Sequence, residues 1–142
     1  MIEPDVFQAA LIALLQGDTD LTDELAEGAA GVREAEWHST AFSYPCVRVR
    51  RSALSPYGNG NCSHRMSNAA FEVTVLSKRD SSITIQQIQA LVSKALEGQV
   101  LDTADLRTIS IRTTQVGPAQ PQPENDGIWI GSLAFRTVVI ER

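Results

Sequence analysis

Cysteine and histidine, the residue types that most often bind metals or act as nucleophiles, are scarce in this chain. It holds two of each in 142 residues. Cys62 and His64 stand one residue apart in a stretch rich in glycine and asparagine, and could supply two metal ligands. A closed zinc site needs four ligands at characteristic spacings, and no second Cys/His pair exists. We therefore interpret both as loop residues and predict no metal site.

Other catalytic patterns are incomplete. Cys46 stands among valines, which predicts a small buried hydrophobe rather than a nucleophile. The Gly58-Asn59-Gly60 stretch lacks the Lys-Ser/Thr ending of a phosphate loop. Asp18, Asp20 and Glu24 come without the glycine and terminal glutamate of a calcium loop. We predict no catalytic residue and no cofactor, and expect that the protein is not an enzyme.

The charges are unevenly distributed. Residues 1–36 hold nine acids and one base, for a charge of −8, and residues 37–142 carry +3. The acidic total and the lack of interleaved aromatics argue against sequence-specific nucleic-acid binding. If copies of the chain assemble in a ring, opposite charges would guide head-to-tail contact between them. The alternative is that the arginines pair within their own subunit. The basic residues proposed for this contact are Arg48, Arg50, Arg51 and Arg107.

Length and composition indicate one globular domain over residues 1–142. A chain of this size buries enough surface for a core without staples, and two cysteines are too few for a disulfide framework. No apolar run approaches the 18 residues that span a bilayer. Glu3 and Asp5 replace the basic start of a signal peptide, so we expect a reducing cytoplasm as the site of synthesis and assembly.

Hydrophobic periodicity predicts an α+β fold: about four strands in a mostly antiparallel sheet, with two main helices on one face. The predicted order is helix-strand-strand-helix-strand-strand. The final strand has apolar residues on both faces, so it is either central or bulged at Gly131. Val47 and Val49 alternate with arginines, which predicts one wet or interfacial face on the first strand, and Ile109 and Ile111 are expected to share a face. The predicted helices are 5–16, 21–26 and 83–97, the strands 44–52, 69–78, 106–116 and 127–140, and the irregular or loop segments 28–43, 53–68 and 117–126.

This layout resembles the tail-terminator (tail-completion) proteins of long-tailed bacteriophages, from about residue 6 to residue 140. The likeness rests on a pattern of elements and not on a chemical signature. Its segments are Leu11-Ile12-Ala13-Leu14-Leu15-Gln16-Gly17-Asp18, Tyr44-Pro45-Cys46-Val47-Arg48-Val49-Arg50, Phe71-Glu72-Val73-Thr74-Val75-Leu76, Ile88 to Gly98, and Leu133-Ala134-Phe135-Arg136-Thr137-Val138-Val139. Gly31-Val32-Arg33 resembles the start of the family's first strand, without the Pro-rich stretch that would follow it.

The resemblance implies a virion protein that forms a homo-hexameric ring on the end of the tail tube. Such a ring stops tube growth and joins the tail to the head-completion or neck protein. DNA would pass through the lumen of the ring without sequence-specific contacts. The resemblance implies neither a cofactor nor a membrane. The two loops 53–68 and 117–126 are expected to be mobile in the free subunit and to contact these partners. The interface residues predicted are Arg48, Arg50, Arg51, Pro56, Tyr57, Asn59, Arg107, Pro121 and Pro123.

Three other functions stay open on sequence grounds. Another head-tail joining protein, such as a head-completion or neck protein, shares the size and the assembly logic. A small intracellular oligomeric enzyme could form its active site between subunits, although the shortage of histidine and of clustered polar residues counts against it. A non-viral binding module is the third, and no peptide-recognition motif supports it.

Overall fold

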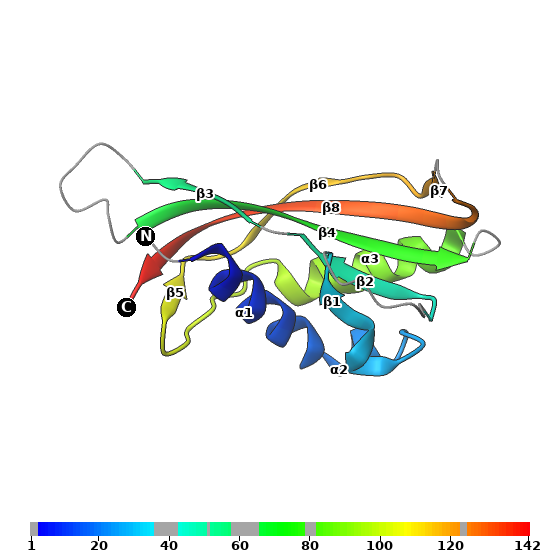
Figure 1. Cartoon of the computed structure of the whole chain (residues 1–142), viewed down its shortest axis with the longest axis horizontal. Coiled ribbons are helices and arrows are strands. Elements are labelled where there is room, and N and C mark those ends of the chain that lie inside the picture. Colours follow the sequence, from blue (N-terminus) through cyan, green and yellow to red (C-terminus); the bar gives the residue numbers. More distant parts are fainter. Residues whose placement is uncertain (1–2, 36–42, 51, 58–65, 79–81, 123–124) are drawn as a thin grey trace.

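A computed structural model of the protein describes residues 3–35, 43–50, 52–57, 66–78, 82–122 and 125–142 (Figure 1). The helical elements are α1 (Pro4–Gln16), α2 (Thr19–Thr22), the 3-10 turn η1 (Gly28–Gly31) and α3 (Ser82–Leu96). The strands are β1 (Val32–Glu34), β2 (Cys46–Val49), β3 (Ala53–Pro56), β4 (Met66–Lys78), β5 (Leu106–Thr108), β6 (Arg112–Val116), β7 (Gln120–Gln122) and β8 (Asn125–Glu141).

Two long antiparallel strands, β4 and β8, form the middle of a single eight-stranded sheet. They pair without interruption from Met66 opposite Ile140 to Lys78 opposite Ile128. Short strands line their outer edges: β2 and β3 pair with β4, whereas β5, β6 and β7 pair with β8. β1 adds to β2 in parallel, so the sheet is mixed. Its central strand pair therefore fixes the position of every other strand except β1.

The helices pack on one face of this sheet because its strands alternate apolar and polar residues. Phe71, Val73 and Val75 of β4 are buried under α1 and α3. Phe71 stacks on Phe135 of β8 with ring centroids 5.1 Å apart, and meets Phe7 of α1 edge-on at 5.6 Å. These aromatic contacts join the helical layer and the two central strands in one core.

Local sequence signals set the helix ends. Pro4 lies in the first turn of α1, where a missing N–H costs nothing. The Asp18 side chain accepts a hydrogen bond from the Leu21 N–H (3.0 Å) and caps α2. Gly98 follows α3 with φ +76°, a conformation that favours glycine. The predictions of both long helices are confirmed, whereas the short helix predicted at 21–26 is α2 at Thr19–Thr22.

The prediction of four strands is wrong, because the sheet has eight. The sheet is mostly antiparallel, as predicted, and β1 with β2 is its parallel pair. Residues 28–34, in the segment 28–43 predicted to be irregular, form η1 and β1. β3 occupies part of the predicted loop 53–68, and β7 occupies part of 117–126. Those segments are too short to show a hydrophobic period, and they gain their hydrogen bonds from β4 and β8. The prediction of a central final strand is confirmed, since β8 is paired on both sides.

The predicted third strand, 106–116, is two strands with a break. Ile109 donates its N–H to the carbonyl of Val138 (3.1 Å), whereas Ile111 donates to Gln99 (2.9 Å) beyond α3. Ile111 is therefore fully buried while Ile109 is 50% exposed. The expectation that these two isoleucines share a face is wrong, because the backbone changes partner between them.

Candidate functional site

The face of the sheet that carries no described helix is the surface most open to partners. In Figure 1, α1, α2 and α3 all lie on one side of β4 and β8. Along β8, Leu133, Phe135 and Val139 face that helical layer and are buried. The alternate residues, Ala134 and Arg136, therefore point to the opposite side, which we call the open face.

A groove of about 520 Å³ crosses the open face between β3 and the junction of β5 with β6. Five of its twelve lining residues are alanine or serine, and none is acidic. Ile109 contributes a half-exposed apolar side chain beside Val138. The lining residues are Ala53, Leu54, Ser55, Asn68, Ala69, Ala70, Ile109, Ser110, Arg112, Arg136, Thr137 and Val138.

Two arginines give the groove a positive charge. Arg112 of β6 and Arg136 of β8 stand directly opposite each other in register, and both are exposed. Like charges in such a pair repel, so the site favours an anionic group between them. Arg107 lies on the same face of β5, opposite Ile140. The groove therefore combines an apolar patch with cations, as protein interfaces do.

The rim of the groove at β6 is held to α3 by polar contacts. Glu97 accepts hydrogen bonds from the Thr113 N–H (2.5 Å) and hydroxyl (2.6 Å), and the Ser93 hydroxyl is 3.3 Å from that of Thr113. These hydrogen bonds, with a smaller contribution from Arg112, lower the pKa of the Glu97 carboxyl from its ordinary value of 4.5. The end of α3 therefore fixes the strand from which Arg112 reaches the groove.

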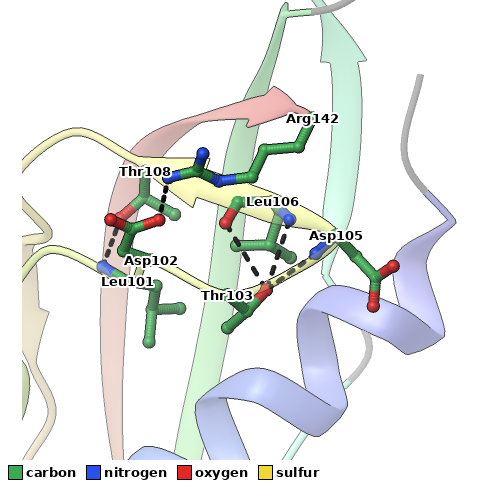
Figure 2. A network of polar contacts seen from close by, with 7 residues as sticks. All are labelled: Leu101, Asp102, Thr103, Asp105, Leu106, Thr108 and Arg142. Carbon is green, nitrogen blue, oxygen red and sulfur yellow. Dashed lines mark hydrogen bonds and ion pairs between the residues drawn. The ribbon is translucent and has the colours of Figure 1, made fainter.

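On the same side of the groove, the neighbouring strand β5 is fixed by a network that Figure 2 shows from close by. The Thr103 hydroxyl accepts hydrogen bonds from the N–H groups of Asp105 (3.3 Å) and Leu106 (3.2 Å). Arg142 pairs with Asp102 through its side chain, and its backbone N–H donates to the Asp105 carbonyl (3.1 Å). Because this turn is closed by side chains, Arg107 and Ile109 are presented from a defined backbone.

The predicted interface residue Arg48 is buried within its own subunit. Its guanidinium donates to the carbonyls of Gly31 (3.0 Å) and Val47 (2.9 Å), and the residue is 9% exposed. All four residues of β2 are buried, so the predicted wet face on this strand is wrong for Arg48. Arg50, just after β2, is exposed. Its neighbour Arg51 lies outside the described residues.

The other predicted interface residues form two separate sets. Pro56 and Tyr57 are exposed at the end of β3, and the Tyr57 N–H donates to Met66, level with Arg107 across the sheet. Pro121 pairs with Trp129, at the far end of β8. The eleven residue-to-residue steps from Trp129 to Ile140 correspond to about 35 Å of strand. Asn59 and Pro123 lie outside the described residues.

Sequence reasoning missed the groove itself. Arg112 and Arg136 are 24 positions apart in the chain, and only the β6–β8 register places them side by side. Each arginine directly follows a buried apolar residue, Ile111 or Phe135, which marks it as outward-facing but does not show that the two pair.

Within the described part of the chain, no cluster of three His, Cys, Asp or Glu residues could hold a metal ion. Cys46 is buried, and burial raises the pKa of its thiol. His38, Cys62 and His64 lie outside the described residues. A helix long and apolar enough for a bilayer is likewise not found among the residues described.

Comparison with known proteins gives a family and a fold. Residues 9–139 match the sequence profile of a family described as tail completion protein gp17. A search of curated proteins found no match. A solved chain from the virion of a native gene transfer agent particle is similar, with a TM-score of 0.75 and 19% identity over 95% of this chain and 94% of that one. A second solved structure, of a protein without a functional name, has a TM-score of 0.65 and 16% identity over 98% and 96%. At these identities the two structures show a shared fold.

Proposed function

Because the chain belongs to the tail completion protein gp17 family, we propose that its subunits form a ring that caps the end of a phage tail tube, stops its growth and joins tail to head. Family membership makes the chain a structural protein of a virion, in the tail or at the head–tail junction. The family match over residues 9–139 is the observation that carries the proposal, since it covers nearly all of the described sheet and most of both long helices.

The proposed mechanism is binding alone, without a catalytic step or a cofactor. One side of a homo-hexameric ring contacts the last ring of the tail-tube protein, and the other receives the head-completion or neck protein. DNA passes through the lumen without base-specific contacts. A cyclic ring requires each subunit to offer two different surfaces to its two neighbours. The open face carries the exposed Arg112 and Arg136, whereas exposed acids lie on and after α2 in the helical layer. These two surfaces of opposite charge support the requirement.

The two ends of the sheet are suited to different partners. Pro56, Tyr57 and Arg107 are exposed at one end, and Pro121 at the other, about 35 Å away by the strand rise. We assign one end to the tail tube and the other to the neck. Arg48 takes no part in this assignment because its guanidinium serves its own subunit.

The experiment has two stages. Light scattering of the purified protein, followed by negative-stain imaging, should give six times the 15.4 kDa subunit mass and rings with a central hole. Rings are then added to polymerising tail-tube protein, and the tubes should stop elongating. Continued elongation in the presence of intact rings would reject the terminator role and favour a head-completion or neck role.

Two exposed substitutions serve as matched variants in the second stage. Tyr57→Asp and Pro121→Asp lie at opposite ends of the sheet, and both positions are exposed. Each variant should keep the ring and lose one partner, because each adds a charge to one end only. Loss of both partners in either variant would contradict the assignment of one partner to each end.

A further inference from the structure

We propose that the groove on the open face binds the acidic corner of a second copy of this chain, and that this contact is what closes the ring. We define the acidic corner as the exposed acids of α2 and the turn after it: Asp20, Asp23, Glu24 and Glu27. The inference rests on the ring proposed above, and it adds which two surfaces meet.

The two surfaces are complementary in charge. The groove presents Arg112 and Arg136 and has no acidic residue in its lining. The acidic corner has four carboxylates in eight residues, and residues 18–30 contain no lysine or arginine. Opposite patches of this kind set orientation and association rate and disfavour pairing of like surfaces. Four of the nine acids in residues 1–36 therefore lie against the two groove arginines of the neighbouring subunit.

The surfaces also differ in shape. The groove lining includes the small residues Ala53, Ser55 and Ala70 beside Ile109 and the two arginines. The acidic corner belongs to the helical layer at the edge of the molecule, where α2 is labelled in Figure 1. The exposed apolar residues within the corner and directly after it are the alanines Ala26, Ala29 and Ala30, which allow close approach. A corner whose apolar side chains are small suits a groove lined in part by small residues.

Both surfaces are rigid before they meet. Leu21 and Leu25 anchor the corner in the core, and the Ala26 N–H donates to the Pro45 carbonyl (3.2 Å). On the groove side, the Thr137 hydroxyl donates to the Ile109 carbonyl (2.8 Å). Preorganised surfaces lose less freedom on association, so a small contact of mixed apolar and ionic character can be specific.

The positions of the two surfaces suit a ring and not a closed dimer. The groove lies on the open face and the corner belongs to the helical layer, on the other side of β4 and β8. A subunit that gives its corner to one neighbour therefore keeps its groove for the next. Such head-to-tail contacts close into rings when the rotation between subunits allows it.

The test uses charge reversal in two variants of the full chain. Arg112→Glu/Arg136→Glu reverses the groove, and Asp23→Arg/Glu24→Arg reverses the corner. Each variant alone should lose ring formation, with the dissociation constant raised roughly tenfold or more at low salt. An equimolar mixture should form rings again, because a reversed corner fits a reversed groove and the native corner fits the native groove. The mixed ring must alternate, so it contains an even number of subunits.

A matched control uses the same charge change on the same strand pair. Lys78 is exposed on the open face of β4, opposite Ile128, eight residues along β8 from Arg136. Lys78→Glu should leave ring formation unchanged, whereas the single Arg136→Glu weakens it. Circular dichroism checks that each variant is folded. If a reversed variant fails to fold, Arg136→Gln removes the charge without adding an opposite one and should weaken assembly in the same direction.

The outcomes separate this inference from the ring itself. A wild-type chain that stays monomeric would overturn both. Wild-type rings that persist unchanged in the groove variant, or a mixture that fails to assemble, would overturn the groove contact alone. If the groove variant assembles but loses affinity for a random-sequence DNA duplex, measured by fluorescence anisotropy, the arginines face the lumen and the inference is wrong.

Discussion

The side-chain amide of Gln89 on α3 fills the space beside Gly131 of β8 that a Cβ atom would need. A Cβ built on Gly131 lies 2.6 Å from Gln89 Nε2, and Ile85 Cγ2 is equally close. The same amide donates to the carbonyls of Gly117 (3.0 Å) and Ser132 (3.3 Å), which joins α3 to the end of β6 and to the central strand β8. Gly131 is therefore required by the approach of the helix to the sheet and not by a bulge in β8.

Gly131→Ala should destabilise the subunit by about 1–3 kcal/mol, because overpacking a tight core forces side chains or backbone to move. Denaturant unfolding of the monomer measures this loss. Gly17→Ala is the control, since Gly17 has φ −81° and an added methyl group would come no closer than 3.5 Å to the Ala13 carbonyl oxygen. That variant should be unchanged or more stable by up to about 1 kcal/mol. Equal stability of the two variants would refute the packing argument.

Arg48→Met should cost about 1–3 kcal/mol of subunit stability, because the Gly31 and Val47 carbonyls lose a charged donor in a buried setting. Arg50→Met, two residues along and exposed, should change stability by no more than about 0.5 kcal/mol. Thermal unfolding of both variants compares them directly. If Arg48→Met unfolds at the wild-type temperature and only assembly suffers, Arg48 is an interface residue after all.

Glu97→Gln should reduce stability at neutral pH and not at low pH. The folded state lowers the pKa of this carboxyl through its hydrogen bonds to Thr113. A group with a lowered pKa stabilises the fold above its ordinary value of 4.5, and that contribution disappears as pH falls below it. Melting curves from pH 7 to pH 3 should therefore converge. Glu3→Gln, at another exposed carboxylate, controls for the loss of one charge, and a constant gap across this range would contradict the prediction.

The Cys46 thiol should resist alkylation in the folded subunit. The residue is 1% exposed, and burial raises its thiol pKa, with Glu27 adding to the rise and Arg48 opposing it. In a Cys62→Ser background, iodoacetamide should modify Cys46 at pH 8 only after denaturation, because the thiolate is the reactive form. Mass spectrometry counts the adducts. Rapid modification of the native protein would show that this part of the sheet opens readily.

Local patterns were sufficient to predict α1 and α3, because each helix has an apolar stripe with clear ends. For the final strand, apolar residues on both faces left two possibilities, a central strand or a bulge at Gly131, and the structure shows the central strand. β1 could not be predicted in the same way. Its three residues show no period, and its parallel pairing with β2 joins Val32 to Val47, fifteen positions along the chain.

The groove depends on information that is not local. Alternation of residues along a strand assigned Ile109 and Ile111 to one face. However, the Ile109 N–H donates to Val138 of β8, whereas the Ile111 N–H donates to Gln99. The pairing of Arg112 with Arg136 follows from strand register, which is set by the packing of β8 as a whole. Residue types alone identify both arginines as outward-facing, but they do not show that the two lie opposite each other.

The position of β8 has a consequence for the order of events during biosynthesis. Four strands, β4, β5, β6 and β7, pair with β8, and every one of them precedes it in the chain. A nascent chain in which β8 has not yet been synthesised therefore lacks the middle of its sheet. The side of the groove formed by β6 and Arg136 takes shape only when β8 pairs. Translation thus completes the self-association surface later than the other described strands, and shorter nascent chains cannot make this contact on the polysome.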